Sequence, residues 1–263
     1  MTGEVVAEPV PPRPRRRLRT ALWTVVALVL ATSIAFVVWA SLAAPAEVGE
    51  LEAALADPGL GVVQGPVVEL WPASGPPTQA VVFYPGARVH RDAYIATWAP
   101  IVAATDTLVL IPRMPLNLAI FGQNRASSLM EAHPEIESWW VGGHSLGGAM
   151  AASFAGDQPP GDLDGLVLWG AYATEGAGLA DRDDLTVLSV SGSRDGLSTP
   201  TDIAERRPLL PDDAIMVEVE GMNHAQFGRY GPQRGDLPAT IHDDEATSRL
   251  LEAHLSVLAD LDG

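Results

Sequence analysis

Five residues, Gly143-His144-Ser145-Leu146-Gly147, join an apolar run to an alanine-rich stretch, and this junction limits the possible folds more than any other feature. The run before it, Trp139 to Gly142, is typical of a buried strand, and the stretch after it is typical of a helix. Gly143 and Gly147 stand two residues on either side of Ser145, where a sharp strand-to-helix turn leaves no room for a Cβ. The junction therefore predicts a serine held on a strained turn between a strand and a helix.

Such a serine is a candidate nucleophile. A serine hydroxyl reacts poorly at neutral pH unless a base accepts its proton and fixed donors meet the developing oxyanion. The helix that begins after Ser145 provides a partial positive charge and the Leu146 N–H as one donor. The alternative is a glycine-rich turn that only packs tightly or binds a phosphate. The glycines lack the spacing of a dinucleotide-binding motif. A P-loop lysine is also missing, because all 16 basic residues are arginine.

A base and an acid follow the serine in the chain. The strand predicted at Thr186 to Ser191 ends in a tight turn with Asp195, and the strand predicted at Ala214 to Glu220 ends in a turn with His224. In parallel sheets the carboxyl ends of strands meet at one edge, so we predict a Ser145, His224 and Asp195 constellation. An Asp-Gly turn also occurs without catalysis, so a purely local role for Asp195 remains open.

The loop after the strand at Ala80 to Tyr84 has the sequence Pro85-Gly86-Ala87. We expect the Ala87 N–H to be the second oxyanion donor, because Gly86 lets the backbone turn inward. An ordinary Pro-Gly turn is the competing interpretation. The histidines lack ligand spacing and the carboxylates are scattered, so no metal site is predicted.

Apolar runs and helical patterns alternate along the rest of the chain, which predicts a mostly parallel sheet with helices on both faces. Strands are predicted near 62–63, 67–71, 80–84, 107–111, 138–142, 165–169, 186–191 and 214–220. Helices are predicted near 93–104, 124–132, 145–155, 200–207 and 243–258.

The N-terminal region differs from the rest. Residues 21–44 contain no charged side chain and span about 36 Å as a helix, enough to cross a hydrocarbon core of about 30 Å. Five arginines lie in residues 1–20, which we expect to be a disordered, basic and cytoplasmic tail. Residues 45–263 would then form a catalytic domain outside the membrane. Cleavage of a signal peptide after Ala44-Pro45-Ala46, with secretion of the domain, is the alternative, although the apolar run is long for one.

After residue 44 the chain has 11 arginines against 31 aspartates and glutamates. This excess of negative charge should repel nucleic acid and anionic lipid surfaces, so polyanions are poor candidates for its ligand. The chain has no cysteine, so disulfides and thiolate sites are excluded.

Five motifs resemble the α/β-hydrolase superfamily, and within it the small bacterial fold-5 group related to dienelactone hydrolases. They are 83–86 (FYPG), 114–119 (MPLNLA), 142–148, 195–198 (DGLS) and 223–228 (NHAQFG). The resemblance covers roughly residues 60–260. It implies an α/β-hydrolase fold with an eight-stranded, mostly parallel sheet, a Ser145-His224-Asp195 triad and no cofactor. Only residues 170–185 are available for a lid, so a large cap is not expected.

The chemistry that the resemblance implies is hydrolysis of carboxylic esters or related small acyl compounds through an acyl-enzyme. Met114, Leu116, Asn117, Phe227 and Tyr230 are candidates for the acyl pocket, although packing would equally explain each of them. Two other functions remain open, transfer of the acyl group to an alcohol in the cell envelope and non-catalytic binding by a membrane-anchored protein of the same fold.

Overall fold

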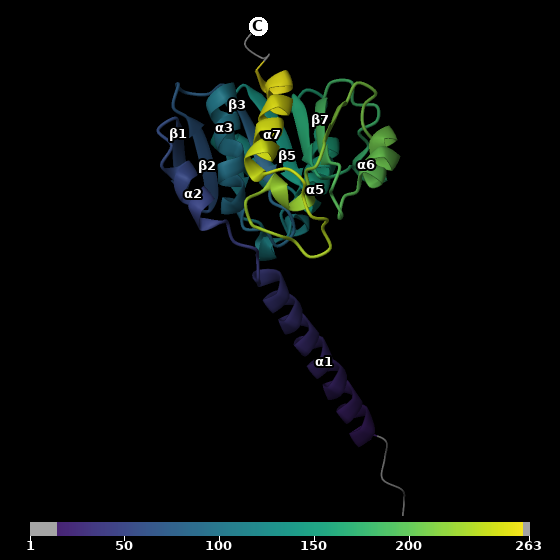
Figure 1. Ribbon diagram of the computed structural model, residues 1–263. Helices are drawn as coiled ribbons and strands as arrows, with labels where there is room; N and C mark the ends of the chain where they lie inside the picture. The colour runs from purple at the N-terminus through teal and green to yellow at the C-terminus, as the bar shows by residue number, and fades with distance from the viewer. Residues whose placement is uncertain (1–14, 260–263) are drawn as a thin grey trace, which may run out of the picture. The chain divides into compact units, whose positions relative to one another are not determined.

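Short runs of β-branched and aromatic residues form one eight-stranded sheet in residues 15–259, the part of the chain that the computed structural model describes (Figure 1). The strand order is β1-β2-β4-β3-β5-β6-β7-β8. β2 pairs antiparallel with β1 and with β4, and every other neighbouring pair is parallel. The strands are β1 (Leu60–Gln64), β2 (Val67–Pro72), β3 (Gln79–Tyr84), β4 (Leu108–Pro112), β5 (Ser138–His144), β6 (Gly165–Trp169), β7 (Thr186–Gly192) and β8 (Ile215–Val219).

Helices cover both faces of this sheet. One apolar cluster joins the sheet to α2 (Val48–Leu55), α3 (Ile95–Thr105) and α7 (Asp243–Leu258), and Figure 1 shows α3 and α7 in front of the strands. A second cluster joins the other face to α4 (Arg125–Ala132) and α5 (Leu146–Asp157). The last helix, α6 (Pro200–Arg206), packs beside β7. The mostly parallel sheet with two helical layers that the sequence predicted is thus confirmed.

Strands β3 to β8 run parallel, so their carboxyl ends meet at one edge of the sheet, which we call the carboxyl edge. The opposite edge is called the amino edge. The connection from β6 to β7 contains only one short 3-10 turn, Glu175–Ala177, so no helical lid covers the carboxyl edge there. The loops at this edge carry Ser145, Asp195 and His224.

Three predictions about elements need correction. The helix expected from residue 145 begins at Leu146, because Ser145 has a φ of 54° that no α-helix admits. Helix α2 was not predicted, since only Ala54 of its eight residues is buried and its apolar pattern is weak. The tail expected to be disordered through residue 20 is helical from Arg15, because arginine and leucine are good helix formers.

The apolar segment predicted at 21–44 corresponds to α1 (Arg15–Ser41). Its residues Leu18–Ser41 are long and apolar enough to cross a membrane, a property that signal sequences share. Residues from Ser41 onward form a separate compact unit. The part of the basic tail at residues 1–14 lies outside the described residues.

An aromatic cluster fills the core between the sheet and α3. Trp98 stacks on Trp169 with 4.8 Å between ring centroids, and Phe83 contacts both rings. His254 of α7 lies against the two tryptophans and accepts a hydrogen bond from Trp169 Nε1 at 3.2 Å. Its Nδ1 donates to the Leu250 carbonyl oxygen at 2.7 Å, so the neutral ring satisfies both neighbours.

Burial lowers the pKa of His254 from 6.5 to about 4, and this predicts acid sensitivity. Below pH 6.5 His254 is protonated in the unfolded chain, whereas in the folded chain it stays neutral until the pH falls to about 4. Folding stability should therefore fall by about 3 kcal/mol as the pH drops through this window. Urea unfolding of wild type and His254→Gln at pH 7 and pH 4 measures the difference, because glutamine does not titrate. An equal loss of stability in both proteins would contradict the assignment.

Candidate active site

Ser145 lies between β5 and α5 with φ 54° and ψ −125°, a conformation that an L-residue holds only under strain. The Ser145 N–H donates to the Trp169 carbonyl oxygen of β6 at 3.0 Å, which fixes the turn against the sheet. A Cβ on Gly147 would overlap the Tyr84 carbonyl oxygen, and a Cβ on Gly143 would overlap the Gly147 backbone. The close approach predicted for the two glycines is therefore present in the structure.

His224 and Asp195 meet at the carboxyl edge although 29 positions separate them in the chain. His224 Nδ1 donates to Asp195 Oδ2 at 2.7 Å, and both side chains are fully buried. The remaining carboxylate oxygen, Oδ1, accepts the Leu197 and Ser198 N–H groups at 2.8 and 2.7 Å. These backbone donors orient the carboxylate, so Asp195 is held to present one oxygen to the imidazole.

Gly170, which follows β6, approaches this pair closely. Its φ is +48°, and a Cβ there would lie 3.0 Å from Asp195 Oδ2 and 2.9 Å from the Phe227 ring. A larger residue would push against the carboxylate that orients His224. Glycine at this position therefore preserves the geometry of the pair.

His224 Nε2 is buried and has no hydrogen-bond partner among residues 15–259. It therefore does not hydrogen-bond Ser145 Oγ in this structure. Both residues nevertheless lie at the carboxyl edge, because each follows the end of a parallel strand. In unliganded sites the bond between base and nucleophile is commonly long and tightens on substrate binding. An unpartnered acceptor in the interior is costly, and a serine hydroxyl would satisfy it.

His144, the residue before the serine, is a second histidine beside the predicted base. Its ring lies 4.4 Å from the His224 ring, centroid to centroid. Tyr94 Oη lies 2.9 Å from His144 Nδ1 and accepts the Gly86 N–H at 2.9 Å. When this hydroxyl donates its one proton to His144 Nδ1, the imidazole proton lies on Nε2.

His144 is fully buried, and burial together with the charge of His224 holds its pKa well below the usual 6.5. A neutral His144 places no second positive charge beside His224 when the latter accepts a proton. The ring therefore acts as a rigid, uncharged neighbour of the predicted base.

The backbone around Ala87 is arranged as an oxyanion donor requires. Gly86 N–H donates to Tyr94 Oη, and Arg88 N–H donates to the Asn117 carbonyl oxygen at 2.8 Å. Within residues 15–259 the Ala87 N–H between them has no acceptor. Leu146 is the first residue of α5, so its N–H also lacks an intrahelical partner. Both predicted donors are thus available, and both residues are partly exposed.

Tyr94 is the residue that sequence reasoning missed, since nothing in the chain links it to Gly86 or His144. Replacing it with phenylalanine should leave a buried N–H and a buried ring nitrogen unpaired and lower kcat on a short ester about tenfold through misplacement of the Ala87 loop. Steady-state kinetics measure this effect.

Tyr84→Phe is the matched control for that variant. Tyr84 is also buried, accepts the Ala126 N–H and donates to the Gln123 carbonyl oxygen, but it lies under α4 rather than beside His144. The two variants should lose similar stability, about 1–3 kcal/mol, while only Tyr94→Phe lowers kcat. Equal kcat values for the two variants would contradict a role of Tyr94 in positioning the Ala87 loop.

The predicted pocket residues divide into two groups. Phe227 and Tyr230 lie 5.4 and 6.3 Å from the His144 ring, and Tyr230 lines a cavity of about 190 Å³ together with Ala87. Met114 and Asn117 line a separate depression beside Pro85. Tyr230 thus shares a cavity with Ala87, the predicted oxyanion donor, whereas Met114 and Asn117 line a depression that does not include Ala87.

Among the described residues no group of three or more histidines, aspartates and glutamates is arranged to hold a metal ion. A cavity of about 300 Å³ lies beside Asn223 and Arg229 and is not lined by Ser145.

Comparison with known proteins agrees with this architecture. Residues 80–248 match the sequence model of the alpha/beta hydrolase family. Among solved structures, Est1E from Butyrivibrio proteoclasticus superimposes with a TM-score of 0.55 at 11% identity, covering 77% of this chain and 100% of that one. The esterase Est2 from Thermogutta terrifontis gives 0.54 at 14% identity, covering 78% and 95%. The esterase domain of a Rhodothermus marinus protein gives 0.57 at 12% identity, covering 76% and 98%.

No curated protein sequence matches the chain. The family match covers more than half of the residues, and it includes the serine turn and the loops with Asp195 and His224. The chain belongs to the alpha/beta hydrolase family.

Proposed function

We propose that the chain is a membrane-anchored serine hydrolase that cleaves carboxylic esters through an acyl-enzyme. The observation that carries this proposal is the buried 2.7 Å hydrogen bond between His224 and Asp195, at the same edge as a serine on a strained turn. A buried His-Asp pair whose outer nitrogen lacks a partner is suited to accept a proton from an alcohol. The esterases among the structural neighbours favour an ester over other acyl compounds.

In the proposed reaction Ser145 Oγ attacks the ester carbonyl carbon while His224 Nε2 takes its proton. Asp195 stabilises the imidazolium through Nδ1 and keeps the ring in position. The N–H groups of Leu146 and Ala87 donate to the tetrahedral oxyanion. His224 then protonates the leaving alcohol, and afterwards it activates the water that releases the acid and restores Ser145.

Covalent labelling tests the nucleophile directly. A fluorophosphonate should attach to Ser145 in the folded protein and not in Ser145→Ala. Ser153→Ala is the matched control, because Ser153 lies on the same helix and only donates to the Ala149 carbonyl oxygen. Peptide mapping that finds the adduct elsewhere, or no adduct in wild type, would overturn the proposal.

The anchor is part of the same proposal, because α1 carries a span that meets the length and hydropathy of a membrane helix. The arginines before it favour a cytoplasmic N-terminus and a hydrolase domain outside the membrane. Protease added to intact cells should then degrade the domain while it stays in the membrane fraction. A soluble mature protein beginning at Glu47 would instead establish signal-peptide cleavage.

A further inference from the structure

The segment that follows α1 is bound directly to the two loops that form the proposed active site. The Ala44 N–H donates to the Arg88 carbonyl oxygen at 2.7 Å, and the His90 N–H donates to the Ala44 carbonyl oxygen at 2.8 Å. A few residues later the Glu47 N–H donates to the Arg229 carbonyl oxygen at 2.7 Å, in the loop that also holds His224. Residues 42–47, here called the linker, therefore run along the carboxyl edge.

The reach of the chain limits how far this edge can lie from the end of α1. Ser41 is the last residue of α1, and Ala44 is already fixed beside the oxyanion loop. Three residues span at most about 10 Å whatever direction the helix takes. If α1 crosses a membrane, the loop with Ala87 therefore lies within or just above the polar surface layer of the bilayer.

A cavity connects the linker with the oxyanion loop. It has a volume of about 190 Å³, and Leu42 and Ala44 of the linker line it together with Ala87, Tyr230 and Arg234. A molecule entering from the linker side would thus pass the proposed oxyanion donor. The cavity therefore extends from the linker to the loop that carries the proposed oxyanion donor, and Ser145 is not among its lining residues.

Exposed apolar side chains gather around the same edge. Leu42 is 64% exposed, Ile120 56% and Leu237 44%, and all three follow α1 or the carboxyl end of a strand. Leu197, in the turn after β7, is also exposed and lies against the Gly235 backbone next to Leu237. Large apolar residues on loop tips favour contact with the interface of a bilayer.

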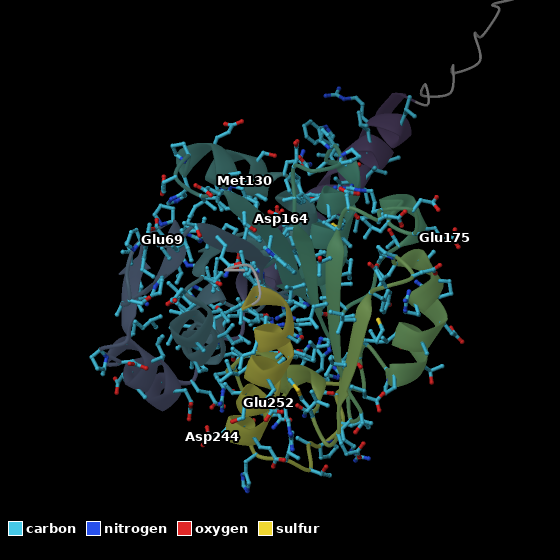
Figure 2. The ribbon with its side chains drawn as sticks, turned by 90° about the horizontal axis from the view of Figure 1, so that it is seen from above. Glu69, Met130, Asp164, Glu175, Asp244 and Glu252 are labelled. Carbon is cyan, nitrogen blue, oxygen red and sulfur yellow. The ribbon has the colours of Figure 1, made fainter. Side chains whose placement is uncertain are left out.

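The charges of the domain are unequally divided between the two edges. Twelve carboxylates and three arginines lie in the segments that precede the strands at the amino edge, at 73–78, 106–107, 131–137, 157–164, 181–185 and 206–214. Asp164, which is labelled in the view from above in Figure 2, is one of these carboxylates. Seven arginines and ten carboxylates lie at the carboxyl edge, in the linker, in the segments that follow strands and in the first turns of α4, α6 and α7, at 42–47, 85–94, 113–125, 170–178, 193–202 and 220–245. An anionic surface would therefore repel the amino edge more strongly than the carboxyl edge.

We propose that the carboxyl edge faces the bilayer in which α1 is anchored, and that the substrate is an ester whose acyl chain resides in that bilayer. This inference rests on the proposed function for its chemistry and on the linker for its geometry. The more negative amino edge then faces away from the bilayer.

Single cysteines test the orientation cleanly, because the chain has none of its own. Full-length Ile120→Cys and Leu237→Cys report on the carboxyl edge, and Asp162→Cys and Asp213→Cys report on exposed positions of the amino edge. Each is labelled with a small fluorophore and placed in phosphatidylcholine vesicles that contain a head-group nitroxide quencher. We expect severalfold stronger quenching at positions 120 and 237 than at 162 and 213. Equal or reversed quenching would overturn the orientation.

An insertion tests the source of the substrate. About twelve glycine and serine residues between Ser41 and Leu42 leave the linker's hydrogen bonds to Arg88, His90 and Arg229 intact and release the edge from the membrane surface. Hydrolysis of a long-chain umbelliferyl ester dissolved in the vesicles should fall about tenfold, because the effective concentration at the site drops. Hydrolysis of p-nitrophenyl acetate in water should stay within a factor of two. Loss of both activities, or of neither, would refute a bilayer substrate.

These results are separable from failure of the proposed function. Quenching reports on orientation whether or not the protein turns over an ester. Fluorophosphonate labelling of Ser145 reports on the nucleophile whether or not a bilayer is present.

Discussion

Asp195→Asn should lower kcat/KM for a short-chain ester by about 10⁴ while leaving the fold intact. The asparagine Oδ1 can still accept the Leu197 and Ser198 N–H groups, so the loop keeps its backbone contacts. Its amide NH₂ would face His224 Nδ1, which then has to be the unprotonated nitrogen. The proton moves to Nε2, and the ring can no longer accept one from Ser145. Steady-state kinetics and circular dichroism on the same preparation measure both effects.

Asp202→Asn is a suitable control for that variant. Asp202 lies seven positions from Asp195 and caps α6 through Thr199 rather than contacting the histidine. Its replacement should cost about 1 kcal/mol of stability and change kcat/KM less than twofold. Near-normal kinetics for Asp195→Asn would leave Asp195 with the local turn role that the sequence also allowed.

The sequence was sufficient for the sheet because each strand is a short apolar run with a turn signal after it. The segments 165–169 and 243–258 were predicted with the bounds that the structure has. A short helix such as α2 escaped prediction, since its stability comes from contacts with α3 and β1 rather than from its own pattern. The end of α1 could not be read from composition either, because the apolar run continues to Ala44 while the helix stops at Ser41.

The candidate site could be predicted from the sequence where a functional residue directly follows a predicted strand. Ser145, Asp195 and His224 each stand just after a strand, so strand order and parallel pairing suffice to bring them to one edge. Tyr94 and His144 stand 50 positions apart, and the bond between them depends on how α3 packs on the sheet. Such a contact leaves no periodic signal in one sequence.

The linker gives the N-terminal segment a second role. In the sequence alone the linker was a spacer between an apolar run and a domain. In the structure it donates hydrogen bonds to the Arg88 and Arg229 carbonyl oxygens, and it lines the cavity that Ala87 also lines. Cleavage after Ala46 would remove Leu42 and Ala44 from the cavity that Ala87 lines. An uncleaved anchor would therefore keep this cavity wall complete.

Ser145→Ala and His224→Gln should each lower kcat/KM by about 10⁴ or more, and the double variant should be no worse than the weaker single variant. The reason is that His224 contributes to catalysis only by accepting the Ser145 proton and returning it to the leaving group. Without the Ser145 hydroxyl there is no proton for His224 to accept, so replacing His224 as well has no further effect on the rate. The residual rate then comes from the Leu146 and Ala87 N–H donors, which neither substitution touches.

Glutamine suits this cycle better than alanine, because His224 is fully buried and a truncation would open a cavity next to Asp195. Its amide can still donate to the carboxylate, so the acid is not left with an unpaired charge in the interior. Single-turnover rates of the four proteins on one ester give the coupling. Independent losses that multiply in the double variant would mean that Ser145 and His224 act separately, and the elbow serine would then not be activated by this histidine.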